Sequence, residues 1–323
     1  MEQSIWVSEK ELYDVTHQSD PRVVAVISAF HPPQDLPERV KQLNRQVIHT
    51  VVVDDGTDVE QTSSVLQELE AMGSTVVRMR ENAGIAAALN EGIDVALSAW
   101  APDFVVTLDQ DSALDDGYIA AALETYAEAS ADGIEVGLVS AQSHNGRNVA
   151  LLSRRARFPE AFDALQSGAV IPVSTLRTAG MLDARLFIDC VDTEYNLRLR
   201  SLGLATLVGK GCNMTHALGR AQPMMLFGWH VAILGRKRHV HSHPPFRVYY
   251  MTRNNIHLWR QYGARFPVWL IRKLRFQLES DVFRMLYGAN RKGQYRAFAR
   301  GFRDGWLGRL GKIDPGFERK ISA

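Results

Sequence analysis

Two carboxylates separated by one residue follow an apolar run in the stretch "VVTLDQDS", residues 105–112. The run is typical of a buried strand, which would place Asp109 and Asp111 at its carboxyl end. Carboxylates are hard oxygen ligands that suit Mg²⁺ or Mn²⁺, and both ions also bind phosphate oxygens. The spacing therefore indicates a metal site for a diphosphate. The alternative is that both residues cap a turn and the helix after it.

A second acidic pair, Asp54 and Asp55, ends the apolar run "TVVVDDG" (50–56). In an open parallel sheet, ligands bind at the carboxyl ends of the strands. We therefore expect all four carboxylates along one edge of the sheet. They would repel one another unless a cation or hydrogen-bond donors lay between them.

The segments that must position these residues alternate between two periods. Continuous apolar runs of strand length are separated by segments in which apolar residues recur every three or four positions. This pattern predicts an α/β fold with a mostly parallel, doubly wound sheet and helices on both faces. The predicted strands are 22–30, 50–56, 74–80, 103–111 and 136–141, and the helices between the first four are 36–46, 59–72 and 85–100.

The second half of the chain predicts a helix that ends at Gly203 and one last strand in "ATLVGKGCNMTH" (205–216). From about residue 263 the sequence is helical, aromatic and basic, and no linker rich in Pro, Gly or Ser precedes it. We expect a flexible terminus over 1–20, a catalytic domain over 21–262, and a basic amphipathic helical appendage over 263–323.

Composition limits the possible functions. Of the 323 residues, 46% are hydrophobic and 23% charged, as is typical of a globular enzyme. The net charge of +1 argues against a nucleic-acid-binding protein, although residues 265–312 carry twelve Lys or Arg against three Asp or Glu. Two cysteines and an acidic, polar start without a signal peptide favour a cytoplasmic location.

Five stretches, in order along the chain, resemble the inverting family-2 glycosyltransferases of GT-A fold, and most closely the bacterial rhamnosyltransferases. They are "VVVDDGT", "NAGIAAALNEGI", "VVTLDQDS", "LFIDCVDTEYNLRLRSLG" and "VYYMTRNNIHLWRQY". The form "TLDQDS" is one that the rhamnosyltransferases favour, whereas Asp55 stands where they often carry Asn. The resemblance spans 22–262 and implies transfer of a deoxyhexose, L-rhamnose from dTDP-L-rhamnose, to a hydroxyl of a glycan or lipid-linked glycan in cell-surface polysaccharide synthesis.

The resemblance also implies roles for single residues. Asp109 and Asp111 would hold Mg²⁺ or Mn²⁺, with His216 as a further ligand, and Ser28 with Asp54 would hold the base and ribose of the donor. Contacts with the nucleotide-sugar are implied for Ser28, Asp54, Asp55, Asn82, Gly84, Asp109, Gln110 and Arg253. An alternative for Asn82 is that it caps the helix that follows it.

Inverting transfer needs a base that takes the proton of the acceptor hydroxyl. The resemblance assigns this role to Asp192 in "FIDCVDTE". It assigns contacts with the acceptor or sugar to Ser167, Gly168, Asp189 and Glu194. The alternative is that Asp192 is the N-cap of the predicted helix, with Glu194 in the first helical turn.

The basic stretch "PVWLIRKLRFQLESDVFRMLYG" (267–288) has the composition of an interfacial helix that binds anionic lipid at the inner face of a membrane. The apolar residues of this predicted helix are Trp269, Leu270, Leu274, Leu278, Phe283 and Leu286. A helix packed on the catalytic domain is the alternative.

Other functions fit the sequence less well. A dinucleotide-dependent dehydrogenase would need G-x-G-x-x-G after the first strand, where "AFHPPQ" stands. A UDP-hexose remains an alternative donor, and a non-catalytic subunit that binds sugar nucleotides remains an alternative to an enzyme.

Overall fold

The computed structural model describes residues 20–152, 157–216, 243–275 and 290–322, together with the backbone of short strands between 221 and 241. Apart from Asp20, the terminus that the sequence predicts to be flexible lies outside the described residues.

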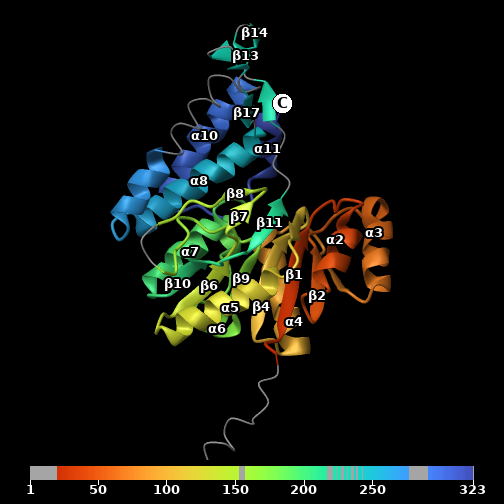
Figure 1. Cartoon of the computed structure of the whole chain (residues 1–323). Helices are drawn as coiled ribbons and strands as arrows, with labels where there is room; N and C mark the ends of the chain where they lie inside the picture. The colour runs from red at the N-terminus through yellow and green to blue at the C-terminus, as the bar shows by residue number, and fades with distance from the viewer. Residues whose placement is uncertain are drawn as a thin grey trace, which may run out of the picture.

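The main sheet has seven strands in the order β10-β6-β9-β4-β1-β2-β3 (Figure 1). The strands β3, β2, β1 and β4 are parallel neighbours, and β9 is antiparallel to both β4 and β6. The bounds are β1 Val23–Ala29, β2 His49–Asp54, β3 Thr75–Arg78, β4 Phe104–Asp109, β6 Val136–Ser140, β9 Ala169–Pro172 and β10 Ala205–Val208. The predicted mostly parallel α/β sheet is confirmed.

Helices cover both faces of this sheet because successive strand residues point to opposite faces and both are apolar. Val23, Ala25 and Ile27 of β1 pack with the helices on one face, and Val24 and Val26 pack with those on the other. The first set is α2 Leu36–Leu43, α3 Val59–Ala71 and α5 Tyr118–Ala131, and the second is α4 Ile85–Trp100, α6 Val173–Ala179 and α7 Val191–Ser201, with the 3₁₀ turn Ala184–Leu186 beside them.

The single last strand predicted over 205–216 is wrong, because the chain turns between Gly209 and Cys212. After β10, the strand β11 (Asn213–His216) joins a second sheet in the order β5-β11-β7-β8. The other strands of this sheet are β5 Ser112–Leu114, β7 Ser143–His144 and β8 Arg147–Asn148. Since β5 begins directly after Asp111 and pairs Ser112 with His216, the turn brings His216 to the acidic edge of the main sheet.

Short strands follow β11, and they pair in antiparallel fashion as β12 with β17, β13 with β14, and β15 with β16. Their bounds are β12 Ala221–Pro223, β13 Met225–Leu226, β14 Trp229–His230, β15 Ala232–Ile233, β16 Arg236–Lys237 and β17 His239–His241.

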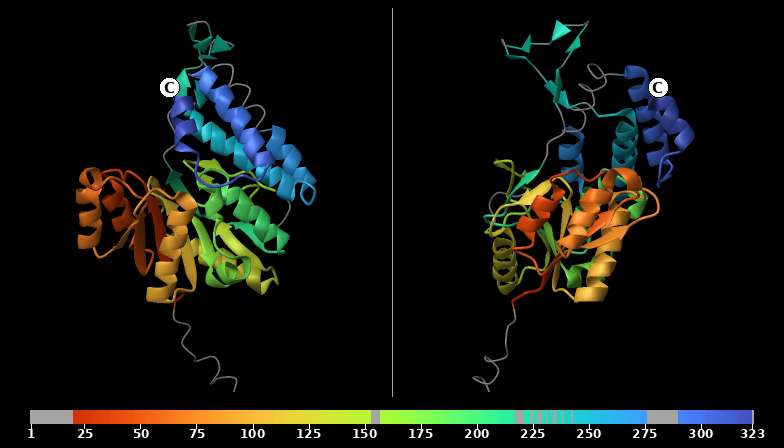
Figure 2. Two further views of the ribbon diagram at one scale, coloured as in Figure 1. Left: turned by 180° about the vertical axis from the view of Figure 1, so that it is seen from behind. Right: turned by 90° about the vertical axis from the view of Figure 1, so that its right-hand side faces the viewer.

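The C-terminal helices lie over the carboxyl ends of the main strands, as both views of Figure 2 show. They are α8 Pro245–Tyr262, α10 Arg291–Trp306, α11 Pro315–Ser322 and a helix that is described from 267 to 275. The helix α10 packs closely on α8, where Gly301 and Gly305 leave room for its backbone. The helical layer thus starts with α8, before the predicted boundary at 262. Among the described residues, none of the helices has the length and hydrophobicity that a membrane span requires.

The helix at 267–275 packs along one side on α7 and α8. Trp269 is 3% exposed and packs with Leu197 and Leu258, whereas Val268 and Ile271 are 66% and 67% exposed. Of the residues predicted for an interfacial helix, Leu278, Phe283 and Leu286 lie outside the described part of the chain. The packed alternative therefore holds for one side of this helix, and its other side is open.

Candidate active site

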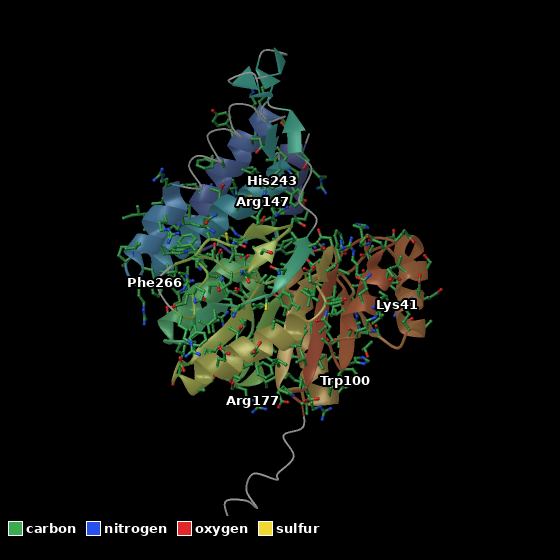
Figure 3. The ribbon with its side chains drawn as sticks, in the orientation of Figure 1. Lys41, Trp100, Arg147, Arg177, His243 and Phe266 are labelled. Carbon is green, nitrogen blue, oxygen red and sulfur yellow. The ribbon has the colours of Figure 1, made fainter. Side chains whose placement is uncertain are left out.

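The carboxyl ends of three neighbouring strands carry residues that the sequence analysis selected. Ser28 on β1 pairs in register with Asp109 on β4, and Ala29 pairs with Asp54 on β2. These polar side chains share one edge of the sheet, below the C-terminal helices. Trp100 lies at the opposite edge, with Arg177 (Figure 3).

Asp109, Asp111 and His216 form a compact group at this edge. One ligand atom from each residue lies within 4.8 Å of the others. The imidazole Nδ1 of His216 is 3.2 Å from Oδ1 of Asp111. Two carboxylates and one imidazole are a donor set that a hard divalent cation such as Mg²⁺ or Mn²⁺ accepts. The residues therefore fit the metal ion that the resemblance implies.

Two serines connect the three candidate ligands. The Ser112 hydroxyl lies 2.8 Å from Nδ1 of His216, and the Ser167 hydroxyl donates to Ser112 at 2.7 Å. Ser167 also accepts a hydrogen bond from the backbone N–H of Asp109 at 3.1 Å. Ser167 is 2% exposed, and its hydroxyl positions the Asp109–Asp111 loop; the sugar contact predicted for it stays a prediction.

Gly168 is also enclosed. Its φ is +86°, and an added Cβ would lie 2.7 Å from the sulfur of Met214 and 2.8 Å from the Tyr118 hydroxyl. The Tyr118 hydroxyl donates to the Gly168 carbonyl at 2.7 Å. Tight packing therefore fixes the loop of Ser167, and the sugar contact predicted for Gly168 stays a prediction.

The Asp109 carboxyl lies in a partly buried, crowded position. Burial raises its pKa to about 6; His216 opposes this shift and the Asp111 carboxylate adds to it. The Gln166 amide donates a hydrogen bond to Oδ1 of Asp109, which favours the ionised form. Two carboxylates held this close together would be stabilised by a divalent cation between them.

Asp54 and Asn82 present unsatisfied acceptors at the same edge. Oδ2 of Asp54 accepts from Thr57 N at 3.2 Å, whereas its buried Oδ1 has no partner among the described residues. The buried Oδ1 of Asn82 likewise lacks a partner in the described part of the chain. Asn82 does not cap α4, since Gly84 occupies the N-cap position. Both side chains thus remain available to N–H or O–H donors of a ligand.

Asp55 and Gly84 have structural roles at the start of α4, and the nucleotide contacts predicted for them stay predictions. The two oxygens of Asp55 accept from Ala83 N at 2.7 Å and Gly84 N at 2.9 Å. Burial raises the pKa of Asp55, and these two amides oppose the shift. Gly84 has a φ of +94°, and a Cβ there would overlap the carbonyl of Phe187. The two neighbouring aspartates therefore differ in role: Asp54 has an unpaired oxygen among the described residues, and Asp55 fixes the start of α4.

Gln110 connects two strand ends. Its Oε1 accepts from Phe30 N at 2.9 Å, and its Nε2 donates to the Phe30 carbonyl at 3.0 Å. Both ends of the amide are used in this way, and the nucleotide contact predicted for Gln110 stays a prediction. The side chain positions the Asp109–Asp111 loop against β1.

Arg253 is enclosed within the protein, and the nucleotide-sugar contact predicted for it stays a prediction. The residue is 1% exposed, and its guanidinium donates to Leu186 O at 2.9 Å and to Gly311 O. The arginine that reaches the site is Arg247, which pairs with Asp189 at 2.6 Å and whose charge acts on Asp109. Sequence reasoning missed it because the arginine within the resembling stretch, "VYYMTRNN", is the buried one.

Asp192 is the second residue of α7. The N-cap is Cys190, with a φ of +64°, so the N-cap alternative for Asp192 is wrong. Oδ1 of Asp192 accepts from Thr193 N at 2.7 Å. Burial and the neighbouring Asp163 carboxylate raise the pKa of Asp192 to about 7, while Lys273 opposes the shift.

Glu194 points into the protein. It is 4% exposed, pairs with Arg198 at 2.7 Å and accepts from the Tyr262 hydroxyl at 2.9 Å. These contacts fix α7 to α8. The acceptor contacts predicted for Glu194 and for Asp189, which pairs with Arg247, stay predictions.

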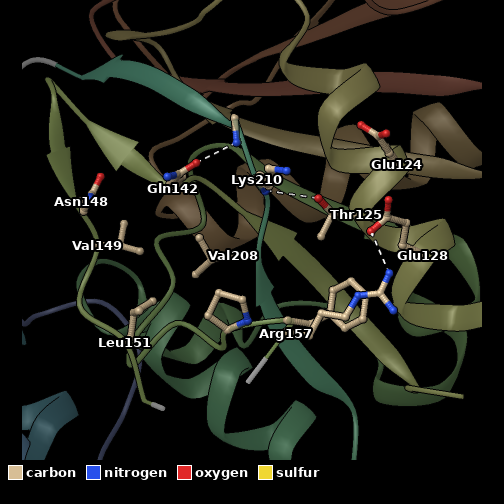
Figure 4. A pocket seen from close by; sticks show the side chains of 13 residues that line it. Glu124, Thr125, Glu128, Gln142, Asn148, Val149, Leu151, Arg157, Val208 and Lys210 are labelled. Atoms are coloured by element: carbon tan, nitrogen blue, oxygen red, sulfur yellow. Dashed lines mark hydrogen bonds and ion pairs between the residues drawn. The ribbon is translucent and has the colours of Figure 1, made fainter. Parts of the chain in front are cut away.

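A cavity of about 780 Å³ lies elsewhere, between α5 and the segment that follows β7 (Figure 4). Its walls include Thr125 and Lys210, and the backbone N–H of Lys210 donates to the Thr125 hydroxyl at 3.2 Å. They also include Glu128 and Arg157, which form an ion pair. None of the residues singled out above lines it. The candidate active site is therefore the acidic edge of the sheet.

Comparison with known proteins agrees with this geometry. The family model described as "Glycosyl transferase family 2" matches residues 24–182. The dTDP-rhamnosyl transferase RfbF of Shigella flexneri is 28% identical over 252 residues, which cover 74% of this chain and 80% of that protein.

The structure of GalNAc-T7 supports the fold. GalNAc-T7 with UDP, GalNAc and Mn²⁺ has a TM-score of 0.56 and 13% identity, covering 95% of this chain and 55% of that chain. S. aureus TarS 1-349 has a TM-score of 0.45 and 14% identity, covering 89% of this chain and 72% of that chain. The sheet that carries the acidic edge lies largely within the matched segment 24–182. The chain has the GT-A fold, and the match of residues 24–182 together with the likeness to RfbF supports a family-2 glycosyltransferase close to the rhamnosyltransferases.

Proposed function

We propose that this protein is a metal-dependent rhamnosyltransferase. It transfers L-rhamnose from dTDP-L-rhamnose, with inversion, to a hydroxyl of a glycan or lipid-linked glycan in cell-surface polysaccharide synthesis. Two observations support dTDP-L-rhamnose as the donor: the similarity to the dTDP-rhamnosyl transferase RfbF, and the "TLDQDS" form of the acidic motif.

The observation that carries the proposal is the group of Asp109, Asp111 and His216, whose ligand atoms lie within 4.8 Å of one another. In this proposal the three side chains hold Mg²⁺ or Mn²⁺. Bound there, the ion would act as a Lewis acid that stabilises the negative charge of the departing diphosphate. Arg247 adds a fixed positive charge near Asp109.

The donor nucleotide is proposed to bind along the ends of β1 and β2. The free Oδ1 atoms of Asp54 and Asn82 accept from the base N–H and the ribose hydroxyls, with Ser28 beside them. A site built to hydrogen-bond such groups rejects ligands that lack them, because its buried acceptors would then stay unpaired.

Asp192 is proposed to take the proton of the acceptor hydroxyl. A general base is most effective when its pKa lies near the working pH, and the raised pKa of Asp192, about 7, meets this condition. A positioned base of this kind contributes about a hundred- to ten-thousandfold in rate.

The C-terminal region is proposed to contact the anionic inner face of the cell membrane. The exposed Val268 and Ile271 stand beside the exposed Arg265 and Arg275, a combination of apolar and basic groups that suits anionic lipid. The protein would then be a peripheral protein on the cytoplasmic side, close to lipid-linked acceptors.

A panel of nucleotide sugars tests the donor. Purified protein is incubated with Mn²⁺ and dTDP-L-rhamnose or a UDP-hexose, and release of the nucleoside diphosphate is followed with and without chelator. The expected result is release from dTDP-L-rhamnose that stops in chelator and in Asp111→Asn. Release from a UDP-hexose instead would favour that alternative donor, and binding without release from any sugar nucleotide would favour a non-catalytic subunit.

A further inference from the structure

Lys273 connects the C-terminal helix at 267–275 to the start of α7. Its ammonium pairs with the Asp163 carboxylate, and the two side chains are only 15% and 18% exposed. The same ammonium lies 3.4 Å from the Thr193 hydroxyl, which itself donates to Asp163 at 3.0 Å. Three segments far apart in sequence thus form one hydrogen-bonded group.

This group lies directly beside Asp192. Thr193 Oγ1 is 3.5 Å from Oδ1 of Asp192, and the second oxygen of Asp163, Oδ1, is buried without a partner in the described part of the chain. The charged or titratable neighbours of Asp192 are Asp163, Asp189 with its partner Arg247, Cys190 and Lys273. Lys273 is the cation that acts on Asp192 directly.

The helix that carries Lys273 is held in place by its neighbours. Trp269, one turn earlier, is buried against α7 and α8. The Arg272 guanidinium stacks 4.2 Å over the Phe162 ring and donates to Leu151 O at 3.1 Å. Burial opposes the charge of Lys273, but Asp163 and its other acidic neighbours outweigh burial and raise its pKa. Lys273 therefore stays protonated throughout the neutral range.

We propose that Lys273 is a positioning residue for Asp192: by holding Asp163 and Thr193, it orients the Asp192 carboxylate and supplies a positive charge that favours the ionised form. This inference rests on the proposed function, in which Asp192 is the base. It assigns part of the catalytic machinery to the C-terminal helix, outside the matched segment 24–182.

Two substitutions that should shift the pKa of Asp192 in opposite directions test this proposal. Lys273→Met removes the cation, so the pKa of Asp192 should rise by about one unit or more, the effect expected of an opposite charge at such a distance. Asp163→Asn removes a neighbouring anion, so the pKa of Asp192 should fall. Lys273→Arg keeps the charge and should leave the pKa close to that of the wild type.

The readout is the carboxyl ¹³C resonance of Asp192, assigned with Asp192→Asn and followed through a pH titration of the whole protein. The pH below which kcat/KM for glycosyl transfer falls should rise in Lys273→Met and decrease in Asp163→Asn. The loss of kcat/KM in Lys273→Met should be recovered at high pH, where Asp192 is ionised again. Binding of dTDP with Mn²⁺ should stay unchanged. The control is Lys41→Met, at a 62% exposed position on α2 on the other side of the molecule from Phe266 (Figure 3).

An Asp192 resonance whose midpoint moves in neither variant overturns the proposal, as does a rate loss in Lys273→Met that is equal at every pH. If Lys273→Met does not fold, Asp163→Asn decides alone, since it must lower the midpoint. Failure of the proposed function is distinguishable, because the resonance would shift as expected while the wild type transferred no sugar.

Discussion

The hydroxyl of Ser112 lies 2.8 Å from Nδ1 of His216, and this contact joins the start of β5 to the end of β11. The antiparallel pairing of these short strands places the imidazole beside Asp111. His216 therefore reaches the acidic edge through a sheet that the sequence does not reveal.

Ser112→Ala tests whether this contact orients a metal ligand. Loss of a hydrogen bond to a ligating residue typically weakens metal affinity by about ten- to a hundredfold. We expect a reduction in Mn²⁺ affinity of that order, measured by titration calorimetry in the presence of dTDP. Ser98→Ala is the matched control, since the exposed Ser98 hydroxyl donates to the Asp94 carbonyl of its own helix. Equal Mn²⁺ affinity in Ser112→Ala and the wild type would contradict the orienting role.

The pH dependence of transfer tests Asp192 as the base. A carboxylate accepts a proton only when it is ionised, so its raised pKa, about 7, predicts that kcat/KM falls as the pH is lowered through 7. Asp192→Asn should lower the rate by about a hundred- to ten-thousandfold at pH 8. Donor binding should stay nearly unchanged, because the proposed donor contacts lie on β1, β2 and β4. A variant that loses donor affinity and keeps its rate would make Asp192 a structural residue.

Two arginines of α8 should behave in opposite ways. Arg253→Met removes the guanidinium that donates to the Gly311 carbonyl, whereas the Leu186 carbonyl keeps Asn254 and the backbone N–H of Ile188 as donors. We expect the free energy of unfolding, measured in urea, to fall by about 1–3 kcal/mol, the cost of one buried group left without its partner. Arg247→Met should change stability less and activity more, since Arg247 is 38% exposed and acts on Asp109. Stability unchanged in Arg253→Met would contradict its structural role.

Contact with a membrane should depend on the exposed side of the helix at 267–275. Replacing Val268 and Ile271 with Ser should weaken binding to vesicles that contain phosphatidylglycerol and leave catalysis with a soluble acceptor intact. Truncation near Gly263 would be a poor test, because it also removes Trp269 and Lys273. Vesicle binding that is equal in the double variant and the wild type, or insensitive to salt, would contradict the proposed membrane contact of this helix.

The main sheet was predictable because its strands are continuous apolar runs, whereas the break between β10 and β11 depends on a turn at Gly209 that periodicity does not mark. At the site, the residue types indicated which edge of the sheet carries the polar side chains. They did not indicate which of these side chains are already hydrogen-bonded to backbone groups. Asp55 and Gln110 are polar residues of the predicted edge, yet backbone groups from other segments occupy them. Lys273 was missed because its partner Asp163 is distant in sequence and the two meet only through tertiary packing.

A crystal structure with Mn²⁺ and dTDP, recorded with anomalous scattering at the manganese edge, tests the central claim most directly. The account predicts one strong manganese peak between Asp109, Asp111 and His216, in contact with the diphosphate, and the loss of that peak in Asp111→Asn. A diphosphate bound at this edge without manganese, or manganese bound away from these three side chains, would contradict it.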